Sequence, residues 1–222
     1  MLPKDAREME SNAYCQSHEF LSYSAVYWAD HFRDQESNKG MRTIERFLED
    51  SNHGPITGRW ERDYSTVLQA ASLGGHKEMV QMLLGKGADV NAQGGYYGNA
   101  LQVASSEGYN KVVQMLLEKG ADVNAQGGYY GNALQAASSE GHNKVVQMLL
   151  EKGADVNTQG DHHSNVLYAA SSGGYDKVVQ MLLEKGADVN TQGGHYGNTL
   201  QAASSKGHDK VVQMLLEKGA IR

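Results

Sequence analysis

The stretch GNALQVASSEGYNKVVQMLLEKGADVNAQ, residues 98–126, decides the fold because the chain returns to it almost letter for letter. A second copy, GNALQAASSEGHNKVVQMLLEKGADVNTQ, begins at Gly131. Three weaker copies begin near Ser65, at Ser164 and at Gly197. The Gly-Ala-Asp triplet recurs every 33 residues from Gly87 onward. A fixed period of this size predicts a stacked array of small structural units rather than one compact core.

The composition and charge of the chain restrict its possible functions. Its 222 residues fit one domain or a short array. The net charge of −6 argues against a nucleic-acid backbone as the main ligand, since that would need a basic stripe. Cys15 is the one cysteine, so no internal disulfide forms, which fits a reducing compartment. The sequence has no apolar run of membrane-spanning length and no signal peptide, so we expect a cytoplasmic or nuclear protein that binds neither membrane nor nucleic acid.

The letters of one unit predict two short helices and a finger. Residues 100–106 form a first helix of small residues, which lets neighbouring units approach closely, and Gly108 ends it. Residues 112–117 form a second, more apolar helix, which Gly120 ends. The glycine pair at 94–95 is expected at the hairpin turn of a finger.

The segment before the array predicts a cap. After a polar start, residues 17–33 and 41–50 each place apolar side chains on one helical face, and residues 51–63 read as a loop. We therefore divide the chain into a polar segment with a two-helix cap or linker, 1–64, and five repeats, 65–222. The repeats span about 65–97, 98–130, 131–163, 164–196 and 197–222.

Residues 65–222 resemble ankyrin repeats. The family letters G-H, V-V, L-L and G-A-D-V-N stand in register at 141–142, 145–146, 149–150 and 153–157. The usual T-P-L-H tetrad is Asn-Ala-Leu-Gln at 99–102, where Asn can still cap the helix and Gln can still form hydrogen bonds. The resemblance implies an all-α ankyrin-repeat solenoid of helix-turn-helix units with β-hairpin fingers, here with an N-terminal helical cap.

A second resemblance concerns the particular amino-acid sequence of the repeats. GGYYGNALQAAS, residues 127–138, is similar to the ankyrin arrays of filamentous fungi, which often follow a nucleotide-binding NACHT module in proteins similar to NOD-like receptors. Residues 18–23 and 27–31 resemble the helical stretch that joins module and array there. No phosphate loop of the G-x-x-x-x-G-K-[ST] type occurs in this sequence. The resemblance implies the sensor arm of an immune-type receptor, as a fragment or a stand-alone relative.

The repeats differ from one another in their fingers and at the ends of their first helices. In the ankyrin family these positions line the concave surface that contacts partners. Tyrosine suits such a surface because it combines a large contact area with a polar tip and little rotamer entropy. The resemblance therefore implies these partner-binding residues: Tyr96, Tyr97, Tyr129, Tyr130, His162, His163, His195, Tyr196, Glu107, Glu140 and Lys206. The alternative is that the tyrosines only stack along the fingers.

Catalytic and metal chemistry find little support. The serines recur with the array, and no G-x-S-x-G elbow occurs, so we expect no enzyme and no cofactor. His162, His163 and His195 could approach one another, but exposed histidines without a supporting shell rarely hold a metal, so none is expected. The function expected is a protein-interaction scaffold. The alternatives are a structural spacer without a specific partner and a metal-regulated module acting through the finger histidines.

The last repeat is expected to behave differently from the others. Terminal repeats normally carry a polar outer face, but residues 211–216, VVQMLL, keep the interior sequence unchanged. We therefore predict that residues 197–222 fray first, or that another copy or a longer native chain covers this face. Self-association through the C-terminal repeat is the form of this prediction that is easiest to test.

Overall fold

The computed structural model describes residues 67–158 and 165–221, and within them it has ten α-helices and no strands. The helices are α4 (Val67–Leu73), α5 (Lys77–Gly85), α6 (Ala100–Ser106), α7 (Asn110–Glu118), α8 (Ala133–Ser139), α9 (Asn143–Glu151), α10 (Val166–Gly173), α11 (Asp176–Glu184), α12 (Thr199–Ser205) and α13 (Asp209–Glu217). They confirm the predicted all-α repeat solenoid. The predicted cap at 1–64 lies outside the described residues, and the proposed domain division stays a prediction.

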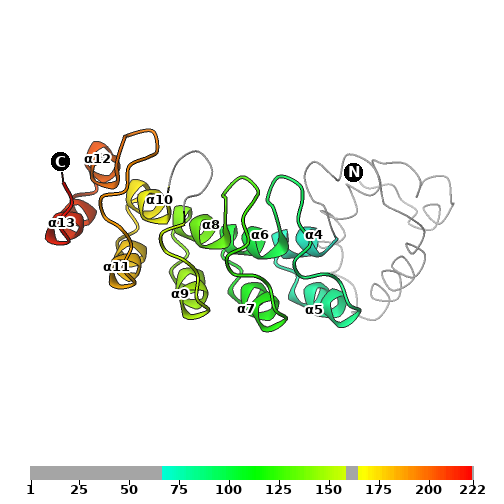
Figure 1. Cartoon of the computed structure of the whole chain (residues 1–222). Coiled ribbons are helices and arrows are strands. Elements are labelled where there is room, and N and C mark those ends of the chain that lie inside the picture. The colour runs from blue at the N-terminus through cyan, green and yellow to red at the C-terminus, as the bar shows by residue number, and fades with distance from the viewer. Residues whose placement is uncertain (1–66, 159–164, 222) are drawn as a thin grey trace, which may run out of the picture.

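The helices form two layers along an elongated array (Figure 1). The first helices of successive repeats, α4, α6, α8, α10 and α12, make one layer, and the second helices, from α5 to α13, make the other. The fingers that follow α5, α7 and α11 run to the next first helix and project beyond the first layer. None of the described helices is long and apolar enough to cross a membrane.

Asparagine side chains cap the N-termini of four of the first helices. In α6, Asn99 Oδ1 accepts a hydrogen bond from the backbone N–H of Gln102 at 2.9 Å, and Gln102 Oε1 accepts one from the backbone N–H of Asn99 at 3.1 Å. This reciprocal pair satisfies two donors that the helix start would otherwise leave unpaired. Asn132, Asn165 and Asn198 cap α8, α10 and α12 through the same side-chain oxygen. Asparagine therefore fills the capping role expected for it.

The core lies where the two layers and the neighbouring repeats meet. Ala104 and Ala137 in the first helices and Val113, Val146 and Leu149 in the second helices have no exposed surface. The small first-helix residues allow adjacent helices to approach, as the sequence predicted. The second helices α7, α9 and α11 therefore bury a stripe against their own first helix and against the repeats on either side.

Glutamine side chains hold two of the fingers to the first helix of the repeat that precedes each finger. Gln102 Nε2 donates hydrogen bonds to the carbonyl oxygens of Ala125 at 3.1 Å and of Gly131 at 3.2 Å. Gln69 makes the same kind of contact to Gly98 at 3.1 Å. Both glutamines are almost fully buried, so these bonds satisfy polar groups that water cannot reach. The finger is thereby fixed from one side by a buried side chain.

A ring at the start of most second helices packs on a glycine of the preceding repeat. Gly108 has φ +72°, a backbone region that favours glycine, and an added Cβ would lie 2.5 Å from Nδ1 of His142. His142 Nε2 lies 2.8 Å from the carbonyl oxygen of Ser106, which can only accept, so Nε2 carries the proton. His208 repeats this bond to Ser172 at 3.1 Å. These histidines therefore serve packing and hydrogen bonding.

Candidate partner-binding surface

The fingers that follow α5 and α7 bring two of the predicted tyrosines face to face. Each finger is closed by one backbone bond, Gly94 N–H to Gly98 O at 2.7 Å and Gly127 N–H to Gly131 O at 2.9 Å, rather than by strands. The rings of Tyr96 and Tyr129 stack with centroids 4.9 Å apart and an interplanar angle of 18°. The two rings therefore stack, which is compatible both with stacking alone and with contact to a partner.

Stacking does not remove these rings from solvent. Tyr96 is 47% exposed and Tyr129 is 46% exposed, so about half of each side chain remains available. The backbone N–H of Tyr129 donates to the carbonyl oxygen of Tyr96 at 2.8 Å, which joins the two fingers directly. Burial, with Tyr129 and Tyr97 adding to it, raises the pKa of Tyr96, so its hydroxyl stays neutral. The pair forms a fixed, half-exposed aromatic surface.

The second tyrosine of these two fingers is less exposed than the first. Tyr97 meets Tyr96 edge to face at 5.0 Å, and Tyr130 meets Tyr129 in the same way at 5.2 Å. Tyr130 donates its hydroxyl proton to Oε1 of Glu140 at 3.4 Å. Burial first, and the Glu140 carboxylate second, raise the pKa of Tyr130 well above its usual value. Tyr130 is therefore a neutral donor that supports a carboxylate.

The three charged residues of the predicted surface occupy one structural position. Glu107, Glu140 and Lys206 are the C-cap residues of α6, α8 and α12, and all three are exposed. The equivalent residue at the end of α10 is Gly173. The charge along this line of caps therefore changes from acidic to neutral to basic as the array proceeds.

Two of the remaining predicted residues, His195 and Tyr196, pair with each other. His195 and Tyr196 lie in the finger between α11 and α12, where their rings meet edge to face at 5.1 Å. His162 and His163 lie outside the described residues. Within residues 67–158 and 165–221, no group of three His, Cys, Asp or Glu side chains could hold a metal ion. The metal-regulated alternative therefore stays a hypothesis about the finger histidines.

In the fourth repeat Tyr168 stands where Gln69 and Gln102 stand in the first two repeats. Its contact with the finger could not be inferred from the sequence. Its hydroxyl accepts a hydrogen bond from the backbone N–H of Tyr196 at 3.1 Å. The ring occupies the space beside Gly194, where any Cβ would overlap it. In this repeat a buried tyrosine therefore replaces the buried glutamine and contacts the finger through its ring and its hydroxyl.

Sequence reasoning missed a column of asparagines at the base of the fingers. Asn124 Nδ2 donates to the carbonyl oxygen of Gly153 at 3.2 Å, and Asn124 Oδ1 accepts from the backbone N–H of Asp155 at 2.9 Å. The same pair of bonds recurs one unit earlier and in the next two units, through Asn91, Asn157 and Asn190. The signal was present as the last letter of each G-A-D-V-N motif. These bonds fix the spacing on which the finger surface depends.

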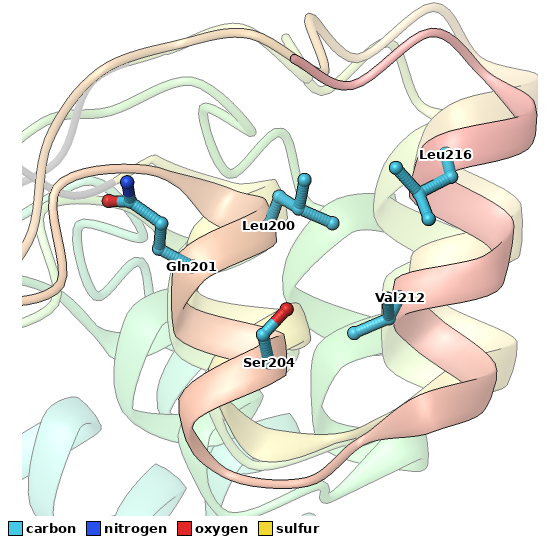
Figure 2. A pocket seen from close by; sticks show the side chains of 5 residues that line it. All are labelled: Leu200, Gln201, Ser204, Val212 and Leu216. Atoms are coloured by element: carbon cyan, nitrogen blue, oxygen red, sulfur yellow. The ribbon is translucent and has the colours of Figure 1, made fainter. Parts of the chain in front are cut away.

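The end of the array that faces away from the fourth repeat carries a shallow apolar hollow (Figure 2). It is lined by Leu200, Gln201, Ser204, Val212 and Leu216, which come from α12 and α13. Leu216 is 42% exposed, whereas its counterparts Leu150 and Leu183 are 8% and 9% exposed. The last repeat therefore exposes apolar surface that its sequence shares with the interior, as expected.

These features define a class: a solenoid of paired helices with a fixed finger surface. The family model of ankyrin repeats, described as three copies, matches residues 36–127 and 134–221. The chain therefore belongs to the ankyrin-repeat family. The match begins within the segment assigned above to a cap, at residue 36. No curated protein matches the chain. Ankyrin repeats are generally protein–protein interaction modules, and the family is typically non-enzymatic.

Proposed function

We propose that the chain is a protein-binding scaffold without enzymatic activity, whose partner contacts the fingers and the C-terminal ends of the first helices. The observation that carries this proposal is the Tyr96–Tyr129 pair, which is stacked, joined through the backbone and still about half exposed. An aromatic surface that is rigid before binding loses little conformational entropy when a partner arrives. The cytoplasm or the nucleus is the proposed compartment.

The proposal competes with a spacer that binds nothing specific. Purified chain, immobilised and exposed to extract, should retain one protein far above background, identified by mass spectrometry. A variant with Tyr96→Ala and Tyr129→Ala should lose it. The matched control changes Gln114→Ala and Gln147→Ala, which are exposed on the second helices one repeat apart and should leave retention unchanged. Equal retention by the tyrosine variant would move the binding face elsewhere, and no enrichment at all would favour the spacer.

The finer proposal is that the array is the sensor arm of a receptor similar to NOD-like receptors. This proposal is supported only by the amino-acid sequence of residues 127–138 and 18–31. Sequencing the full transcript tests it. A reading frame that places a phosphate loop of the nucleotide-binding type before this array would support the proposal. A transcript that encodes no such module would contradict it.

Self-association through the last repeat is a second proposed interaction. The exposed Leu216 and the hollow beside it support it, because contiguous apolar surface usually marks an interface or a liability. Light scattering across a concentration series should show an increase in mass, and Leu216→Lys should abolish that increase. A mass that stays monomeric for the unmodified chain at every concentration would contradict this proposal.

A further inference from the structure

The tyrosine cluster lies in a part of the surface where negative charge is not balanced. Residues 91–107 and 124–140, which carry the two fingers and the first helices after them, contain Glu107 and Glu140 as their charged side chains and no lysine or arginine. The ion pairs between described residues join Lys77 to Glu78 and Lys210 to Asp176. Neither carboxylate of the finger surface takes part in them, so both keep their charge available.

The Glu140 carboxylate contacts an aromatic side chain. Tyr130 contacts Glu140 directly, at 3.4 Å between the hydroxyl oxygen and Oε1. Tyr97 and the Glu107 carboxylate add smaller contributions to the raised pKa of Tyr130, after burial and Glu140. Tyr97 and Glu107 occupy the positions in the second repeat that Tyr130 and Glu140 occupy in the third. The hydroxyl proton of Tyr130 stays in place, so the phenol supports the Glu140 charge without cancelling it.

Aromatic rings beside unpaired carboxylates match the chemistry of a cation on a flexible stem. A guanidinium can lie over a tyrosine face and form two parallel hydrogen bonds to a carboxylate at once. A lysine ammonium can make either contact but lacks the planar fork. Because the arrangement of tyrosine pair and C-cap glutamate occurs twice, one repeat apart, it suits a segment with more than one cation.

We propose that Tyr97, Tyr130, Glu107 and Glu140 bind the cationic side chains, arginine in preference to lysine, of a basic peptide segment of the partner protein. This inference rests on the proposed function and narrows the class of partner. Lys206 occupies the same C-cap position in the last repeat, so the preference for cations is confined to the second and third repeats. The bound segment is therefore expected to place its basic residues toward the N-terminal half of the array.

A random peptide library displayed on phage tests the inference with the full chain immobilised. Sequencing the retained peptides should show enrichment of arginine. The test variant carries Glu107→Gln and Glu140→Gln, which keep shape and remove two charges. The matched control carries Glu118→Gln and Glu151→Gln, two exposed second-helix carboxylates with the same one-repeat spacing. Arginine enrichment should persist in the control and disappear in the test variant.

One retained peptide, labelled and followed by fluorescence anisotropy, gives the magnitude. Two partly exposed charge contacts together account for about tenfold in Kd, so the test variant should bind about tenfold more weakly. Added salt should weaken binding to the unmodified chain and to the control more than binding to the test variant, because salt screens exposed charges. Equal Kd values for test and control variants would overturn the inference.

The possible outcomes separate this inference from the proposed function. Retained peptides that lack cations but require Tyr96 and Tyr129 would overturn the basic-segment inference and support the finger surface. Peptides that bind every finger variant equally would contradict both. A library that yields no binder would also overturn the inference, and the extract experiment would then decide the proposed function by itself.

Discussion

The third and fifth repeats have almost the same sequence, but their equivalent side chains differ in exposed fraction. Leu150 and Leu216 end the same VVQMLL segment, yet the first is 8% exposed and the second is 42% exposed. Ser138 is fully buried, whereas its counterpart Ser204 lines the open hollow. The difference comes from the neighbour, because α10 packs on α8, whereas among the described residues the corresponding face of α12 borders the open hollow. In this array, burial is therefore a property of the stack rather than of the repeat.

The packing around the glycine that follows the first helix also differs between the two repeats. The glycine after the first helix has the same backbone in both, with φ +73° at Gly141 and at Gly207. The Tyr175 ring of the following repeat packs against Gly141, whereas a Cβ at Gly207 would meet nothing within 4 Å. The space beside this glycine is therefore occupied by a ring in the third repeat and open in the fifth.

The largest expected contrast is between core and end leucines. Leu149→Ala removes a fully buried side chain and should lower the free energy of unfolding by about 2–5 kcal/mol. Leu216→Ala should lower it by about 1 kcal/mol or less, since much of that side chain already contacts water. Urea denaturation of both variants measures the two losses. A loss below about 0.5 kcal/mol for Leu149→Ala would mean that α9 is not packed as described.

A glycine pair separates backbone strain from packing. Gly207→Ala should cost about 1 kcal/mol, because alanine is strained at positive φ but meets no neighbour there. Gly108→Ala carries the same strain at φ +72° and also forces the His142 ring aside, which should add about 1–3 kcal/mol. Thermal or urea unfolding compares them. If the two alanines cost the same, the ring does not pack on Gly108.

The smallest of the stability contrasts concerns the finger-holding glutamines. Gln102→Ala removes the side chain that donates to Ala125 and Gly131 and accepts from the Asn99 N–H, and it should cost about 1–3 kcal/mol because these buried or partly buried groups lose a hydrogen bond. Gln201 occupies the same position in α12 but is exposed, so Gln201→Ala should change stability by less than about 0.5 kcal/mol. Unfolding curves for the two variants test this, and comparable losses would show that the finger contact contributes nothing.

The fold could be predicted because the period repeats five times and each local signal agrees with the others. The asparagine caps, the glycine helix ends and the exposed last repeat all follow from letters at fixed offsets. The sequence offered stacking of the finger tyrosines as an alternative, but it did not give the specific contacts of the candidate surface. The stacking of Tyr96 on Tyr129 and the bond from Tyr130 to Glu140 depend on the distance between fingers, which is set by buried glutamines and by the asparagine column. Periodicity identifies which residues are equivalent, but it does not give the distances between neighbouring copies.

Hydrogen exchange on the unmodified chain tests the central claim, that stability here comes from neighbouring repeats. The amides of Met214 to Leu216 should exchange much faster than those of Met148 to Leu150, although the two segments have the same letters. Adding one repeat with a polar outer helix after residue 222 should slow exchange at Met214 to Leu216 toward the interior rate. If these amides are as protected as Met148 to Leu150 in a chain that stays monomeric, the end repeat is stable without a neighbour and the account is contradicted.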